Sequence, residues 1–230
     1  MIKNVKITTI PRLLDLIAPH SCRGCGHTGA ILCPRCKNYI LRQRQLVCPN
    51  CKTPLKSASC PRCKSLPRIY TIGPREGLLD DLIHTYKYES VRALAPVFAE
   101  LLDEILPQDL PENTLVVPLP TSTKHIRERG LDHTLLIAKH LARLRGWRVS
   151  RPLERVKNTV QVGSSKSTRL AQADAAYRVK DNFVPDSSAT YLILDDVWTT
   201  GATIKAVLKK LRAAGVDHIC IALLAYSELA

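Results

Sequence analysis

The sequence predicts an α/β protein with a doubly wound, mainly parallel sheet, preceded by a small cysteine-rich module. Short apolar runs alternate with amphipathic stretches over residues 67–230, which is typical of parallel strands covered by helices on both faces. Four C-x-x-C pairs occupy residues 20–66. The chain has 230 residues, 45% of them hydrophobic, which is enough for one compact domain and a small module.

We expect residues 1–19 to form a short amphipathic lead, with RLLDLI as its apolar part. The start of the chain has no long apolar region and no small-residue cleavage site, so we expect no signal peptide. No run of about 18 apolar residues occurs anywhere, which argues against a membrane span. We therefore expect a cytoplasmic protein.

The positive charge is concentrated near the N-terminus. The formal net charge is +14, and residues 1–70 hold 13 Lys and Arg against one acid, Asp15. Residues 71–230 hold 21 Lys and Arg against 19 acids. A basic surface of this kind favours phosphate backbones, because binding releases counterions. A lysine-rich surface that only aids solubility is the alternative interpretation.

Eight of the nine cysteines form pairs whose two-residue spacing presents both sulfurs to one tetrahedral ion. The pairs are Cys22/Cys25, Cys33/Cys36, Cys48/Cys51 and Cys60/Cys63. Without an export signal, zinc fits these cysteines better than disulfides. Four pairs make two closed Cys₄ sites, which leave no open position for catalysis, so both zinc ions should be structural.

Each C-x-x-C pair is a zinc knuckle, and two ways of combining the four knuckles into two zinc sites stay open. Sequential pairing closes the two shortest loops and gives a tandem zinc ribbon, which we favour; interleaved pairing is the alternative. Cys220 stands alone in the apolar run HICIALLAY, where we expect a buried strand residue.

Hydrophobic periodicity places the elements of residues 67–230 in order. Apolar positions repeat at helical spacing over residues 77–106, with a break expected near residues 88–90. Pro-bounded and β-branched runs indicate strands, and Gly215 is placed as a helix C-cap. The expected order is a strand in RIYTIGP, the broken helix, a strand at 114–120, a helix at 131–145, a strand in WRVSRPL, a polar stretch, a strand at 190–194, a helix at 203–214 and a strand at 218–225.

Residues 191–203, YLILDDVWTTGAT, are the most informative stretch. An apolar strand ends in Asp195 and Asp196, and a turn of small residues then leads into a helix. Backbone N–H groups of such a turn, with the positive end of the helix, can hold a phosphate. The two acids are better suited to accept hydrogen bonds from vicinal ribose hydroxyls. The alternative is an ordinary turn in which an acid caps the helix.

A second group of candidate ligands lies outside this stretch. The loop PLPTSTKHIRERG carries Lys124, His125, Arg127 and Arg129, and arginine can grip phosphate oxygens with two hydrogen bonds. A solvated charged loop is the alternative. Lys87, after LLDDLIHTY, is a further candidate for the ligand pocket, and an exposed helical lysine is the alternative there.

The 191–203 stretch resembles the phosphoribosyl-pyrophosphate (PRPP) motif of type I phosphoribosyltransferases, with Trp198 where a smaller aliphatic residue is usual. The resemblance implies that PRPP binds with Mg²⁺, that the ribose hydroxyls meet the acid pair, and that the loop after the strand at 114–118 embraces the pyrophosphate. The implied PRPP-binding residues are Asp195, Asp196, Val197, Thr199, Thr200, Gly201, Ala202, Thr203, Lys87, Arg127 and Arg129, and the two aspartates are also the catalytic candidates.

Residues 20–226 as a whole resemble the ComF competence-protein family. The resemblance rests on K-Y after L-I-H, the R-x-R-G segment, and Arg169, Gln172, Ala176 and Tyr177, together with the order of a zinc module and a phosphoribosyltransferase domain. It implies a role in DNA uptake, with single-stranded DNA and an uptake helicase as partners. The alternative is a non-catalytic DNA- or protein-binding adaptor that uses the zinc ribbon, with a regulatory or vestigial PRPP pocket.

The acceptor of a pentosyl transfer is not readable from the sequence. No residue stands out as its general base, and only a few residues follow the last expected strand. The polar segment 157–172 is rich in Ser, Lys and Thr, and we expect it to fold over the site and exclude water.

Overall fold

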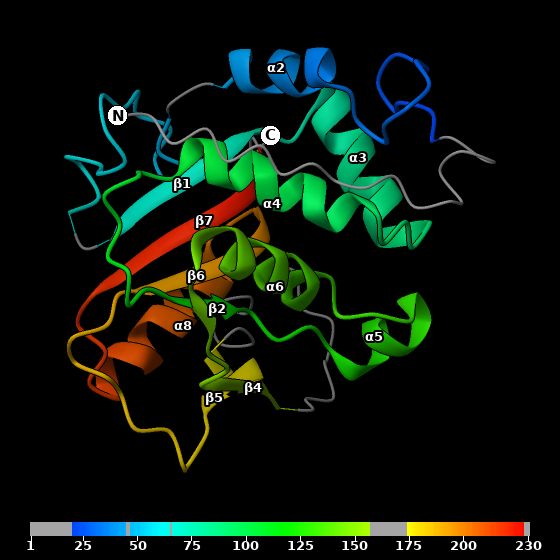
Figure 1. The fold of residues 1–230 in the computed structure, drawn as a ribbon. Helices are drawn as coiled ribbons and strands as arrows, with labels where there is room; N and C mark the ends of the chain where they lie inside the picture. The colour runs from blue at the N-terminus through cyan, green and yellow to red at the C-terminus, as the bar shows by residue number, and fades with distance from the viewer. Residues whose placement is uncertain (1–19, 45–46, 65, 157–173, 228–230) are drawn as a thin grey trace.

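The computed structural model describes residues 20–44, 47–64, 66–156 and 174–227, and its centre is a five-stranded parallel sheet in the order β1-β7-β6-β2-β3 (Figure 1). These strands are β1 Arg68–Pro74, β2 Leu115–Pro118, β3 Arg148–Val149, β6 Tyr191–Trp198 and β7 Ile219–Tyr226. A separate antiparallel pair consists of β4 Leu153–Arg155 and β5 Tyr177–Val179. The predicted doubly wound, mainly parallel sheet is confirmed.

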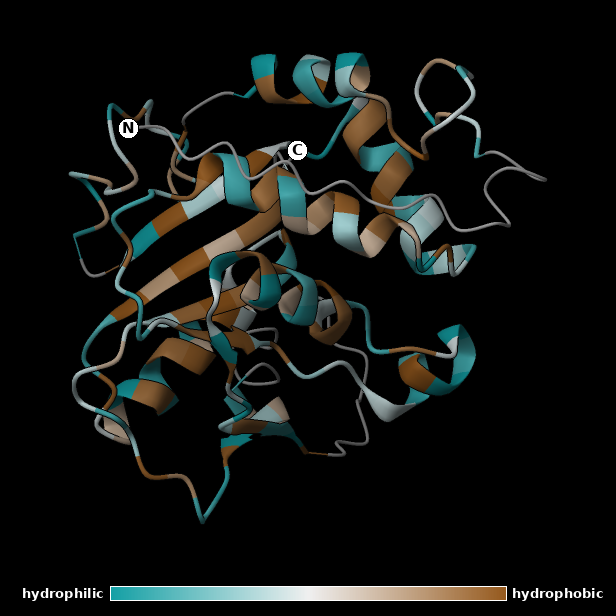
Figure 2. Ribbon diagram, in the orientation of Figure 1, coloured by the Kyte–Doolittle hydropathy of each residue, from teal (hydrophilic) through white to brown (hydrophobic). Residues whose placement is uncertain are grey.

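Helices cover both faces of the sheet. Successive residues of a strand point to opposite faces, and in these strands the residues on both faces are apolar. The helices are α2 Pro34–Arg42, α3 Gly77–Tyr88, α4 Leu94–Ile105, α5 Thr123–Arg129, α6 His133–Arg145 and α8 Ala202–Ala213. Leu192 and Leu194 of β6 belong to the core that α4 and α6 cover, whereas Ile193 packs with α8 on the opposite face. Figure 2 shows the central strands largely in the brown of hydrophobic residues.

Most predicted elements lie where the sequence places them. The break in residues 77–106 separates α3 from α4, and Ser90 there has a left-handed φ of +55°. The stretch WRVSRPL is divided between β3 and β4. The lead 1–19 and the polar segment 157–172 lie outside the described residues.

The structure differs from the predictions at α5, which lies inside a stretch that we expected to be a loop. Ser122 begins α5, and its hydroxyl accepts a hydrogen bond from the backbone N–H of His125 (3.2 Å). Gly130 ends it in the left-handed conformation. Lys124 and Glu128 form an ion pair one turn apart (3.8 Å), which adds modest support. Local caps therefore make a short helix out of a polar sequence.

The first cysteine-rich segment shares the hydrophobic core of the larger α/β unit. Leu32 and Ile40 are buried in the same cluster as residues of β1, α3 and α4, and so are three cysteines of the first ribbon. Lys37 of α2 also pairs with Glu100 of α4. Apolar packing thus continues across the position near residue 66 where the sequence suggests a boundary.

Candidate functional site

Strand β6 carries Asp195 and Asp196 at the carboxyl end of the sheet, where open α/β sheets bind ligands. The strand continues through both acids, and Asp195 lies opposite Leu223 of β7. A carboxylate oxygen of Asp195 accepts from the backbone N–H of Asp196 (2.8 Å), and one of Asp196 accepts from that of Val197 (2.6 Å). These bonds orient the partly buried carboxylates of two consecutive residues at the end of the strand.

Burial, and next the adjacent Asp196, raise the pKa of Asp195 to about 7. Its hydrogen bond from the Asp196 backbone, Lys87 and Arg155 act in the opposite direction. Burial disfavours an ionised carboxyl, and a like charge alongside adds to that effect. The protonation of Asp195 near neutral pH should therefore respond to a cation or a hydroxyl donor bound beside it.

The turn after β6 requires a glycine, both for its backbone conformation and for its packing. Gly201 has a φ of +72°, in the left-handed region that favours glycine, and stands at the N-cap of α8. A Cβ added there would lie 2.2 Å from Cζ2 of the buried Trp198, so the indole fills the space beneath the turn. Thr200 accepts a weak hydrogen bond from the backbone N–H of Ala202 (3.4 Å). Thr199 is exposed and Thr203 partly buried.

Lys87 lies at the site and is not an exposed helical lysine. Its side chain is 16% exposed, and its ammonium nitrogen lies 2.5 Å from a carboxylate oxygen of Asp196. Two bonds fix the end of α3 that carries it. The Tyr86 hydroxyl donates to the backbone carbonyl of His133 (2.9 Å), and the His133 ring pairs with the carbonyl of Tyr86 (2.8 Å). Burial lowers the pKa of His133, which favours the neutral ring.

The two candidate arginines occupy different positions on α5. Arg127 is exposed. The guanidinium of Arg129 lies over the ring of Tyr88, 5.2 Å from its centroid, and the backbone carbonyl of Arg129 accepts from Ser90 (2.9 Å). The structure thus brings Lys87 to the acid pair, whereas Arg129 sits against the end of α3.

Sequence reasoning assigned no role at the acid pair to Arg155, and it saw Tyr177 only as part of a resemblance. Arg155 donates to the Tyr177 hydroxyl (3.1 Å). Burial raises the pKa of Tyr177 to about 12, with the charges of Asp195 and Asp196 contributing in the same direction. Tyr177 and Arg155 therefore lie near enough to the acid pair to interact with it electrostatically. The signal in the sequence was weak, because the polar stretch between β4 and β5 obscured their pairing.

The cysteines gather into two groups, in each of which all sulfurs lie within 4.8 Å of one another. One group is Cys22, Cys25, Cys33 and Cys36, and the other is Cys48, Cys51, Cys60 and Cys63. This grouping follows the sequential pairing. The lone Cys220 is buried in β7.

Each group fits a tetrahedral zinc ion better than disulfides. The sulfurs of Cys25 and Cys33 lie 3.7 Å apart, and those of Cys51 and Cys60 lie 3.5 Å apart. A Zn–S bond of about 2.3 Å requires a separation of about 3.8 Å, whereas a disulfide requires about 2 Å. The Asn50 side-chain amide donates to the Cys63 sulfur (3.2 Å), and a hydrogen bond of this kind orients a thiolate that binds a metal.

The sheet order and the site define the class of protein. The chain is an α/β protein with a doubly wound, mainly parallel sheet, preceded by a module that is compatible with a double zinc ribbon. None of the described helices has the length and apolar character needed to cross a membrane. No protein-family model matches the chain.

The predicted resemblance to the ComF family is confirmed by a curated relative. Competence protein ComFC of Streptococcus pneumoniae (strain ATCC BAA-255 / R6) is 26% identical to this chain over 197 residues. The match covers 82% of this chain and 84% of that protein. It therefore includes most of both sequences.

Solved phosphoribosyltransferase structures are similar only at a distance. The glutamine PRPP amidotransferase of B. subtilis, complexed with ADP and GMP, is 16% identical with a TM-score of 0.43, and the match covers 61% of this chain and 30% of that one. For the hypoxanthine phosphoribosyltransferase of Trypanosoma cruzi the identity is 13% and the TM-score 0.36, with 61% and 66% covered. These likenesses are too weak to add to the topology.

Proposed function

We propose that the chain binds PRPP, or a related sugar phosphate, together with Mg²⁺ at the carboxyl end of β6. The acid pair followed by the left-handed turn into α8 is the observation that carries this proposal. Asp195 and Asp196 would hold the ribose hydroxyls, directly or through the metal. The backbone of Thr199–Thr203 would hold the 5-phosphate at the helix N-terminus. Carboxylate oxygens are the ligands that Mg²⁺ prefers, so the site suits the cation.

Positively charged side chains around the acid pair would bind the pyrophosphate group of the ligand. Lys87 already lies against Asp196, and Arg155 influences the pKa of Asp195. Arg127 and Arg129 would join them when α5 closes on the ligand. These positive groups would stabilise charge that develops on a departing pyrophosphate, which is the step that pentosyl transfer requires.

Ligand binding is tested first by thermal unfolding and titration calorimetry with PRPP, with and without Mg²⁺. We expect Mg²⁺ and PRPP together to raise the melting temperature, since a ligand that binds only the folded state stabilises it. Asp195→Ala combined with Asp196→Ala is the control and should abolish the shift. No shift of the unaltered protein at millimolar PRPP would refute the proposal.

Turnover is a separate question, tested by pyrophosphate release from PRPP across a panel of nucleobases. Release that depends on a base and on the acid pair would identify an enzyme. Binding without release would favour the second candidate function, a non-catalytic adaptor whose sugar-phosphate site is regulatory.

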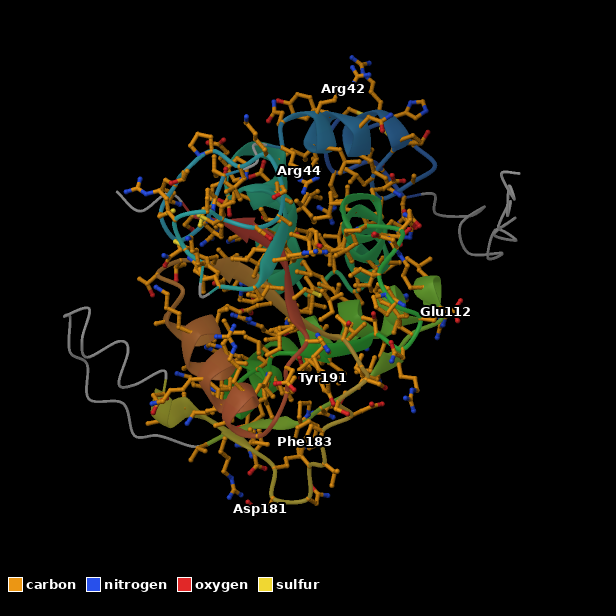
Figure 3. All side chains as sticks on the ribbon, turned by 90° about the vertical axis from the view of Figure 1, so that its left-hand side faces the viewer. Arg42, Arg44, Glu112, Asp181, Phe183 and Tyr191 are labelled. Carbon is orange, nitrogen blue, oxygen red and sulfur yellow. The ribbon has the colours of Figure 1, made fainter. Side chains whose placement is uncertain are left out.

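A specific feature of α2 favours nucleic-acid binding within either function. Arg35, Tyr39 and Arg42 are exposed at helical spacing, so they form one outward stripe, and α2 contains no acid. Figure 3 shows Arg42 extending away from the ribbon. A stripe of this kind suits the phosphates of single-stranded DNA, with one ring available for stacking. The name of the relative ComFC points to a role in competence, where DNA uptake and an uptake helicase would supply the partners.

A further inference from the structure

The two cysteine groups contain the same backbone turn, occupied by different residues. The residue after the second cysteine of the first knuckle is Gly26, with a φ of +74°, and its N–H donates to the carbonyl of Cys22 (2.8 Å). The matching residue of the second ribbon is Lys52, with a φ of +58°, and its N–H donates to the carbonyl of Cys48 (2.8 Å). Lysine adopts this conformation at a cost that glycine does not incur. The difference points to a role for the Lys52 side chain.

The Lys52 side chain reaches the carboxyl end of the central sheet. Its ammonium donates to the backbone carbonyl of Ser227 (2.8 Å) and lies 4.9 Å from the centroid of the Tyr226 ring. Tyr226 is the last residue of β7, and its partner in the parallel register is Trp198, the last residue of β6. Residues 175 positions apart in sequence are therefore joined at this edge.

From this edge, contacts continue to the turn of the candidate site. The backbone N–H of Ser227 donates to the carbonyl of Trp198 (2.8 Å), and the indole of Trp198 lies directly beneath Gly201. A charged hydrogen bond, a backbone hydrogen bond and one tight packing contact thus connect the second knuckle with residues 199–203.

We infer that Lys52 of the second ribbon is a positioning residue for the sugar-phosphate turn, so that the second metal centre supports ligand binding. The inference rests on the proposed function for the identity of the ligand. Metal bound at Cys48 and Cys51 would hold the knuckle in the turn that directs Lys52 toward Ser227. Because coupling free energies are reciprocal, a ligand bound at residues 199–203 would also raise the affinity of the second ribbon for its metal.

The first test measures order at the turn without any ligand. Hydrogen exchange of the amides of residues 199–203 is compared between the unaltered protein and Lys52→Gly, which removes the side chain but keeps the turn. We expect exchange there to become roughly three- to thirty-fold faster, with other amides and the melting temperature little changed. Unchanged exchange at the turn would overturn the inference whether or not PRPP binds.

The second test measures affinity for PRPP with Mg²⁺ by calorimetry. Lys52→Met and Lys52→Gly should weaken binding by roughly three- to thirty-fold, and Lys52→Arg should restore most of it. Lys37→Met, which removes a lysine that ties the first ribbon to α4, is the matched control and should bind as tightly as the unaltered protein. Equal affinity in Lys52→Gly would contradict the inference, whereas failure of the unaltered protein to bind would contradict the proposed function instead.

The third test follows zinc release to a chelator, with the second site identified by its loss in Cys63→Ser. Saturating PRPP with Mg²⁺ should slow release from the second site of the unaltered protein and leave the first site unaffected. Lys52→Gly should abolish this protection. Equal protection of both sites would mean that the ligand acts through global stability, which would also overturn the inference.

Discussion

At the scale of single residues, the ionised carboxylate of Asp195 lowers the stability of the fold but is needed to bind the proposed ligand. Its carboxyl is held where burial and Asp196 favour the protonated form, so ionising it at neutral pH costs folding free energy. A site that binds hydroxyls or a cation needs such a carboxylate nonetheless. Removing the negative charge should therefore remove this cost in folding free energy, and it should also weaken ligand binding.

Asp195→Asn should stabilise the free protein while weakening PRPP binding. Because the pKa rises from an ordinary value near 3.8 to about 7, the folded state binds more protons than the unfolded state within that window. The stability of the unaltered protein relative to the variant should fall as pH rises from about 4 to 7 and level off above. A rise in the pKa from 3.8 to about 7 corresponds to a difference of up to about 4 kcal/mol at pH 8 and none below pH 4, measured by urea unfolding.

Asp181→Asn is the matched control for this prediction, since the side chain of Asp181 is 91% exposed and should change little. A variant at Asp195 that loses stability at pH 8 would contradict the assigned environment.

Trp198 and Gly201 are expected to be energetically coupled. Gly201→Ala introduces a Cβ into the indole and a left-handed alanine, and the backbone term alone costs about 1–2 kcal/mol. Trp198→Val removes the obstructing ring and leaves only the backbone term. Urea unfolding of both single variants and the double variant should give a favourable coupling of about 1 kcal/mol or more. If the changes in unfolding free energy of the two single variants simply add up in the double variant, the added Cβ does not clash with the indole ring.

The sequence revealed the acid pair and the turn because strand, acids and glycine are adjacent in the chain. It could not place Lys87, since whether a helical lysine faces solvent or Asp196 depends on how α3 ends. That end is fixed by Tyr86 and His133, which are 47 positions apart in sequence. Arg155 was missed for the same reason.

At the scale of elements, local signals explain what could be predicted. Amphipathic periodicity located α3, α4, α6 and α8, because each buries one face against the sheet. Periodicity could not locate α5, in which no residue is buried and the caps alone define the helix. Helix α2 was hidden because it begins inside the second cysteine pair: Cys33 is its N-cap, and Cys36 belongs to both the metal group and the core.

The basic stripe of α2 gives a prediction about DNA. Arg35→Glu combined with Arg42→Glu should weaken binding of single-stranded DNA at least tenfold at low salt and reduce the salt dependence of the affinity. Fluorescence anisotropy with a labelled oligonucleotide measures both quantities. Lys139→Glu combined with Arg143→Glu makes the same charge change on exposed positions of α6 and should have a smaller effect. Equal losses in both variants would indicate a response to net charge alone.

At the scale of the whole molecule, the two cysteine groups should differ in their importance for folding. Elemental analysis should find about two Zn²⁺ per chain, and one in either Cys36→Ser or Cys63→Ser. Cys36 is buried within the main core and Cys63 is only partly buried, so Cys36→Ser should lower the melting temperature more. A larger loss in Cys63→Ser, or a zinc content near zero in the unaltered protein, would contradict this assignment.

The packing of the first ribbon into the main core has a consequence for any partner. Helix α2 cannot tumble separately from the sheet, because Ile40 and Lys37 attach it to α3 and α4. A strand of DNA bound along Arg35 and Arg42 would therefore lie at a fixed distance and in a fixed orientation relative to the end of β6. A molecule could therefore reach both surfaces at once only if its length matched that fixed separation.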